Sequence, residues 1–351
     1  MAKKTGSLTI ADLLAARFQS VAEYGEDTVQ DVLAADIAAH NLITTQMLTE
    51  LCEITTDRQA LSGSSLSGEM VEVDEHGRAP TQRDRPGSTV GFPLKLYQFN
   101  VGWTRKWLEG ATPADLAIKT QGAEKAHLRR IQTDIKKAVY ESANYTHRDH
   151  LVDDVDLAVK RFLNADSAPI PDGPNGETFT ASTHTHYDAN ATLTAAVLTA
   201  IIDDVVEHGH GDRVRLNINR SNEAAVRALT GFTAYVDPRL TLQADANEPT
   251  VRATINRLDN RPIGLFGAAE VWVKPWAIAD YYFAHALGGP KPLAFRQRTQ
   301  AALQGLRMVS QSDIHPLVVD FMEAEFGLGV RTRTNGAVLY VGGASYVDPT
   351  I

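Results

Sequence analysis

The chain has 351 residues, 43% hydrophobic and 22% charged, so it can bury the core of one large or two modest domains and has the composition of an ordinary soluble protein. Its 34 Lys and Arg against 43 Asp and Glu give a formal net charge of -9, which argues against a protein that grips nucleic acid over its whole surface. The single cysteine, Cys52, excludes an intramolecular disulfide and any multi-cysteine metal cluster.

The N-terminal segment predicts helices without a targeting sequence. The basic start is followed by no long apolar run, so we expect neither a signal peptide nor a membrane span, and a chain made in the cytoplasm. Residues 9–52 predict two helices, with Thr9 and Asp12 spaced like an N-cap and its partner three residues on. Two alternatives stay open: an arm that lies on a neighbouring subunit, or a helical hairpin packed on its own domain.

The next segment predicts a long two-stranded loop. Residues 70–73 and 90–101 alternate like strands, and residues 74–87 between them are charged and interrupted by Gly and Pro. In the returning strand we expect Phe92, Leu94 and Leu96 on one face. Isolated two-stranded ribbons are marginal in water, so this loop needs a partner to lie on.

A long charged helix follows the loop. Thr112 has the position of an N-cap, Pro113 that of the first helical residue, and Asp115 favours the positive end of the helix dipole. A narrow apolar stripe includes Ile131 and Ile135. If the helix runs to about residue 145, its rise gives a length of roughly 50 Å.

Residues 166–176 are rich in Pro, Gly and acids, and an α/β pattern follows this boundary. The predicted elements are helices over 193–209, 221–228 and 277–286, and strands over 214–218 and around 271–273. Near the C-terminus, Asn335-Gly336 lies between two β-type runs, a pair that favours a type I′ turn, so a hairpin is predicted there.

One group of side chains has the composition of a metal site. It comprises His184, His186, His208, His210 and Asp212. The helix predicted between the two halves is about sixteen residues long and separates its ends by roughly 24 Å, so we expect the halves not to meet and predict no metal. The chain also has no P-loop, dinucleotide-binding or nucleophile-elbow motif, so we expect neither a cofactor nor an enzyme.

In this order of elements the chain resembles the major capsid protein of tailed bacteriophages. The residues that carry the resemblance are 92–103, which lead into Thr112 and the long helix, and 325–340 at the end. The resemblance covers nearly the whole chain and implies an α+β fold with four parts. These are an N-terminal arm (1–55), an extended loop (56–108), a peripheral domain with a long spine helix and long strands (109–190 and 318–351), and an α/β axial domain (191–317).

The resemblance also implies a function. We expect self-assembly into pentamers and hexamers of an icosahedral shell around phage double-stranded DNA, held without sequence specificity, with a portal and scaffold or decoration proteins as further partners. Such a chain assembles in the host cytoplasm and ends in the virion capsid. Some members cross-link a loop lysine to a neighbour's asparagine, but residues 74–87 contain no lysine, so we do not expect this bond here.

Charged side chains in the loop and near the C-terminus are candidates for contacts between subunits, because mixed charges set register and orientation at protein interfaces. They are Arg78, Arg83, Asp84, Arg85, Lys95, Arg331 and Arg333. Two alternative functions remain: the shell of an encapsulin-type compartment with the same fold, and a metal-dependent enzyme that uses the His and Asp side chains.

Overall fold

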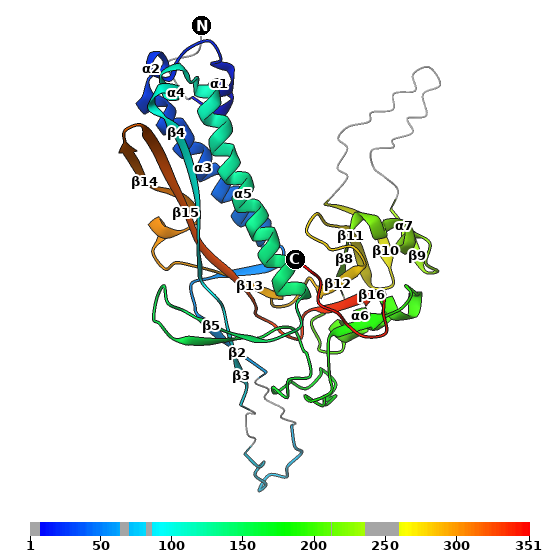
Figure 1. Ribbon diagram of the computed structural model, residues 1–351. Helices are drawn as coiled ribbons and strands as arrows, with labels where there is room; N and C mark the ends of the chain where they lie inside the picture. The colour runs from blue at the N-terminus through cyan, green and yellow to red at the C-terminus, as the bar shows by residue number, and fades with distance from the viewer. Residues whose placement is uncertain (1–7, 64–69, 82–85, 212, 236–259) are drawn as a thin grey trace, which may run out of the picture.

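The computed structural model describes residues 8–63, 70–81, 86–211, 213–235 and 260–351. An elongated part built on one long helix lies beside an α/β unit (Figure 1). A narrow loop projects from the end of the molecule that lies away from the N-terminal helices. The predicted α+β class is confirmed. Within these ranges no helix combines the length and the apolar character needed to cross a membrane.

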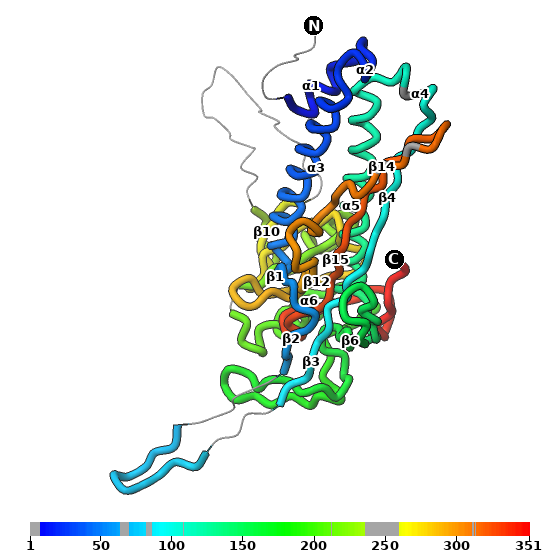
Figure 2. The backbone as a smooth tube through the Cα atoms, turned by 90° about the vertical axis from the view of Figure 1, so that its left-hand side faces the viewer, coloured from blue at the N-terminus to red at the C-terminus, as the bar shows by residue number. Residues whose placement is uncertain are grey.

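The N-terminal segment forms three helices, one more than predicted. They are α1 (Ile10–Ala15), α2 (Val21–Tyr24) and α3 (Glu26–Leu48). Gly25, with a φ of 104°, separates α2 from α3, since this conformation is easy only for glycine. These helices lie beside the long helix (Figure 2). Their buried side chains share one core with it, so the segment packs on its own chain, as the second alternative predicted.

The long helix is α5 (Pro113–Tyr140), 28 residues and therefore about 42 Å. Its predicted start is confirmed: Thr112 N donates to Asp115 Oδ2 at 3.0 Å, and Asp115 N donates to Thr112 Oγ1 at 3.4 Å. It ends earlier than predicted because Glu141 adopts extended backbone angles. Ile131 and Ile135 are buried, as the stripe predicted.

A five-stranded sheet packs beside α5, with β15 (Leu317–Val330) at its centre. One edge of β15 pairs with β4 (Lys95–Thr104), and the other pairs with β14 (Leu306–Ile314) and then β13 (Leu293–Gln297). The strand β1 (Cys52–Thr55) runs parallel to β13 at the sheet edge.

The α/β unit is built on a seven-stranded sheet of order β7-β16-β12-β8-β11-β10-β9. In chain order these strands are β7 (Tyr187–Asn190), β8 (Val214–Ile218), β9 (Phe232–Ala234), β10 (Arg261–Phe266), β11 (Ala269–Val273), β12 (Tyr281–Ala286) and β16 (Ala337–Val341). The helix α6 (Ala195–Val206) buries Leu198, Ile201 and Val205 in the same core as the sheet.

The remaining short elements connect or flank these layers. They are the helices α4 (Arg105–Gly110) and α7 (Glu223–Arg227), the 3-10 turns η1 (Arg220–Asn222) and η2 (Ala301–Leu303), and the strand pairs β2 (Gln59–Ser62) with β3 (Ser88–Gly91) and β5 (Tyr145–Arg148) with β6 (Asp156–Val159). The helix predicted from Ser221 therefore starts later, after η1, which Asn219 caps.

Two predicted elements of the C-terminal part are wrong. The segment predicted as a helix over 277–286 contains β12, whose six residues are all buried because its two faces lie in two different hydrophobic cores. Tyr281 and Phe283 belong to the core that includes α5, and Tyr282 and Ala284 belong to the core that includes α6.

The C-terminal hairpin is also absent, because β15 and β16 belong to different sheets. Neither Asn335 nor Gly336 has a positive φ. The Asn335 side chain instead accepts from Ala286 N at 2.7 Å and donates to Pro290 O at 2.7 Å.

The strand predicted over residues 70–73 is wrong, because these residues form no strand. The outgoing strand of the loop is β2 instead, which pairs antiparallel with β3 at the base of the loop (Figure 2). The returning strand is interrupted at Pro93, which has no backbone N–H to donate, and resumes as β4. Phe92 and Leu94 are buried on either side of this break, whereas Leu96 is 46% exposed and does not share their face as predicted.

Candidate assembly surface

Large apolar side chains are exposed on three elongated elements of the isolated chain. They are Leu61, Met70, Val71 and Val73 on the extended loop, Met308, Val309, Ile314 and Leu317 where β14 turns into β15, and Leu42, Ile43 and Met47 on α3. Exposed apolar groups gathered on projecting segments are typical of surfaces that another protein covers. Sequence analysis missed those at the β14–β15 end.

The charged loop candidates lie at or beyond the edge of the described structure. Arg78 is exposed on the loop. Arg83, Asp84 and Arg85 lie outside the described residues. Their role between subunits remains a prediction.

Lys95 lies at the start of β4 in a cleft of about 450 Å³ lined by both acidic and basic groups. Burial lowers the pKa of its ammonium group, and the nearby Asp134 carboxylate opposes this effect. A partly buried cation beside an open polar cleft remains a candidate for an inter-subunit contact.

Arg331 already has a partner within its own chain. Its Nε lies 2.6 Å from Glu53 Oε2 on β1, and the two side chains are 28% and 44% exposed. Such a partly exposed pair contributes little to stability. A contact of Arg331 with a neighbouring subunit remains a prediction.

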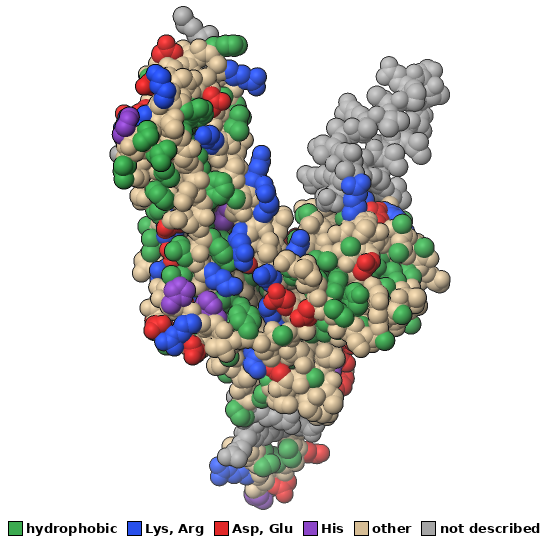
Figure 3. Space-filling view, viewed as in Figure 1, with side chains coloured by type: hydrophobic (Ala, Val, Ile, Leu, Met, Phe, Trp, Pro, Cys, Tyr) green, Lys and Arg blue, Asp and Glu red, His purple; other side chains and the backbone are tan. Residues whose placement is uncertain are grey.

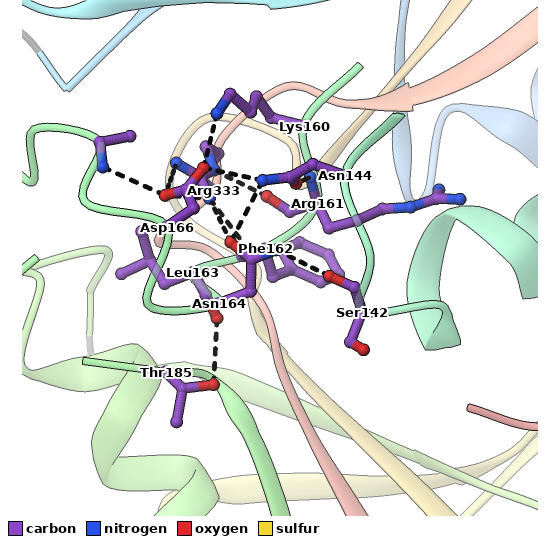
Figure 4. Close-up of polar contacts among 11 residues, drawn as sticks. Ser142, Asn144, Lys160, Arg161, Phe162, Leu163, Asn164, Asp166, Thr185 and Arg333 are labelled. Carbon is purple, nitrogen blue, oxygen red and sulfur yellow. Dashed lines mark hydrogen bonds and ion pairs between the residues drawn. The ribbon is translucent and has the colours of Figure 1, made fainter. Parts of the chain in front are cut away.

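Arg333 is not available for a contact between subunits, because it is 2% exposed. Its guanidinium lies in the connection from β15 to β16 and bonds to the segment after β6 (Figure 4). Its acceptors are Arg161 O at 2.7 Å, Phe162 O at 3.3 Å, Asn164 Oδ1 at 2.9 Å and Asp166 Oδ1 at 3.1 Å. The predicted surface role is therefore replaced by an internal one, which fastens two distant parts of one chain.

Asp166 completes this network. Burial alone would raise the pKa of its carboxyl, but the hydrogen bond from Lys160 at 2.7 Å and the charge of Arg333 outweigh burial and lower the pKa to about 2. The carboxylate is therefore ionised at neutral pH and holds both cations.

The prediction that the two histidine groups stay apart is wrong. The Nε2 atoms of His184, His186 and His208 lie within 3.2 Å of one another. The prediction considered only the helix between them. After His186, the eight residues from 187 to 194, which include β7, lead away from the histidine by up to about 26 Å. The 12 residues of α6 then run back over about 18 Å, which brings His208 close to His184 and His186.

Burial keeps these rings neutral. Together with the neighbouring histidines, burial lowers the pKa of His186 well below its usual range and that of His208 to about 3. His210 lies apart and bonds Thr334 Oγ1 at 2.7 Å, and Asp212 lies outside the described residues. Sequence analysis also missed Glu207, which joins the group and whose only signal was its position beside His208.

The face over α5 is basic. Lys and Arg side chains form a row there (Figure 3), and Lys125 and Arg129 are among the exposed residues of the helix. The negative net charge is therefore distributed unevenly, and this row is a local positive surface.

Comparison with solved structures gives a match over nearly the whole chain. A chain of the structure titled Mycobacterium phage Patience has a TM-score of 0.66 and 19% identity, and the match covers 99% of this chain and 96% of that one. The capsid of a native GTA particle has a TM-score of 0.49 and 15% identity, with 84% and 90% covered. No family model and no curated protein matches the chain.

The match to the Mycobacterium phage Patience chain extends from the N-terminal helices to the last strand. The chain therefore has the predicted fold, the major capsid fold of tailed bacteriophages.

Proposed function

We propose that this chain is a major capsid protein of a tailed phage, a structural and non-catalytic subunit that assembles into an icosahedral shell around double-stranded DNA. The observation that carries the proposal is the shared fold with the Mycobacterium phage Patience chain over 99% of the residues. Rings of five and six copies are the assemblies that we expect, because such head-to-tail contacts close by rotation.

The exposed surface supports the same proposal. The extended loop, the β14–β15 end and α3 expose apolar side chains that the chain itself does not cover. Many such contacts repeated around a ring sum to a stable shell even where each is weak. Portal, scaffold or decoration proteins are further partners in this proposal, and the location is the virion, after assembly in the host cytoplasm.

The test is to express the chain alone and examine it by gel filtration and negative-stain electron microscopy. Shells tens of nanometres across are the expected result. A species that stays uniformly small at high protein concentration and in added scaffold or crowding agent contradicts the proposal.

The contents of the particle distinguish a phage capsid from the alternative, an encapsulin-type compartment. Particles purified from a phage lysate and treated with nuclease should retain double-stranded DNA. Particles that instead carry a co-purified enzyme and no DNA favour the compartment.

A further inference from the structure

Four potential metal ligands converge where β7 begins and α6 ends. The Nε2 atoms of His184, His186 and His208 form a nearly equilateral triangle with edges of 3.2, 3.1 and 3.1 Å. Glu207 Oε1 lies 3.3 Å from Nε2 of His184 and 3.7 Å from Nε2 of His208. We call these four residues the histidine cluster.

Hydrogen bonds alone do not account for this triangle. A neutral imidazole nitrogen either donates its N–H or accepts through its lone pair. Of three such nitrogens at least two are of the same kind, so at least one of the three contacts brings two donors or two acceptors together. A cation bound by all three nitrogens removes the conflict, because it accepts all three lone pairs.

The dimensions fit a tetrahedral ion. Zinc–nitrogen bonds of about 2.0–2.1 Å at tetrahedral angles place two ligand atoms about 3.3–3.4 Å apart. The edges of the triangle are shorter than this by only about 0.2 Å. Glu207 Oε1 lies at this distance from Nε2 of His184 and about 0.3–0.4 Å farther from that of His208, so a small movement of its side chain completes the ligand set. Imidazole nitrogens and carboxylate oxygens are both among the ligands that zinc binds in proteins.

The surroundings orient the ligands. His186 Nδ1 donates to Gly336 O at 2.8 Å, so the proton is on Nδ1 and the Nε2 lone pair faces the other rings. Glu207 Oε1 is inaccessible to solvent and accepts no hydrogen bond. The Phe179 ring packs 4.3 Å from the His208 ring and 4.9 Å from the His184 ring, which covers one side.

We propose that the histidine cluster binds one zinc ion per subunit, as a structural site with four protein ligands. Catalytic zinc sites keep a position open for water or substrate, whereas a full set of protein ligands is typical of structural sites. The ion fastens the end of α6 to β7, which lies at the edge of the seven-stranded sheet. This site is independent of the proposed function, because it lies within one subunit and stabilises it whether or not shells form.

The test uses the full-length chain, purified without a histidine tag and dialysed, with its metal content measured by plasma mass spectrometry. About one zinc per chain is expected. His184→Ala should lower the zinc affinity by at least about 100-fold, since the loss of an outer-shell partner alone costs about 10- to 100-fold. The matched control is His150→Ala, which removes an exposed histidine outside the cluster and should retain the full zinc content.

Two further measurements keep the test independent of how the variant folds. Cobalt added to the metal-free wild type should give the strong visible absorption of a tetrahedral site. A chelator should lower the melting temperature of the wild type and leave that of His184→Ala unchanged. Wild-type protein without zinc above the buffer level, or with only weak octahedral cobalt absorption, overturns the proposal.

Discussion

The helix α5 and the extended loop obtain their stability in different ways. The helix buries a stripe that includes Ile131 and Ile135 against its own chain. By contrast, every side chain in residues 70–81 is exposed, including Met70 and Val71. Burial of apolar area is the main source of folding free energy, so the helix is stabilised within the subunit, and the loop gains comparable burial only against another chain.

The largest loss of subunit stability is expected when charge is placed in the apolar stripe of α5. Replacing both Ile131 and Ile135 with Asp should abolish folding, because each unpaired buried carboxylate costs several kcal/mol. The whole free energy of unfolding of a domain is only about 5–15 kcal/mol. Circular dichroism and a melting curve measure this. The control is the double change of Lys125 and Arg129 to Asp on the exposed face, which should melt near the wild type. A normal melting curve for the first variant contradicts the packing of α5.

Arg333 and Arg331 allow the stability contribution of a buried contact to be compared with that of a partly exposed one. Arg333→Ala should lower the free energy of unfolding by about 3–5 kcal/mol, since it leaves buried acceptors and the Asp166 charge with one partner fewer. Arg331→Ala removes a half-exposed pair and should cost about 0.2–1 kcal/mol. Urea unfolding of both variants measures the difference. Equal losses would show that the Arg333 network does not fasten the fold.

The pH dependence tests the same network from its carboxyl side. The folded pKa of Asp166 is about 2, below the unfolded value of about 3.9. A depressed pKa contributes stability that is fully present above the unfolded value and is lost as pH falls through the folded one. Asp166→Asn should therefore be less stable than the wild type at pH 7, and the difference should shrink from about pH 4 to pH 2. A difference that is independent of pH contradicts this assignment.

The smallest effect on subunit stability is expected in the loop. Deleting residues 74–87 should leave the free energy of unfolding within about 0.5 kcal/mol of the wild type, as for other exposed surface changes. Assembly should be lost, as observed by gel filtration and electron microscopy. A Gly-Ser segment of equal length is the control that separates the loop's side chains from its reach. Normal shells from the deletion variant would show that the loop needs no partner.

Local signals in the sequence predicted local structure well. Thr112, Pro113 and Asp115 specify the start of α5 within four residues, and the structure has that capping arrangement. The strand β8 was predicted for a similar reason, because its alternation lies within five residues.

The failures come from contacts between residues far apart in the sequence. Asn335-Gly336 has the residues of a type I′ turn, yet the Asn335 amide bonds to Ala286, 49 positions away. Gly336 is required for close packing and not for a turn, because a Cβ at this position would lie 2.4 Å from the Phe162 ring. The histidine cluster was missed in the same way, since its convergence depends on how β7 and α6 run against each other.

The position of Cys52 has a consequence for measuring motion in this molecule. It is the only thiol in the chain, it is 2% exposed, and it lies opposite Leu293 where β1 pairs with β13. Burial also raises the pKa of the thiol, so the reactive thiolate is scarce while the strands stay paired. A thiol reagent therefore labels the chain only as fast as this sheet edge opens. The rate of Cys52 labelling thus measures local unfolding at β1, both in free subunits and in assembled particles.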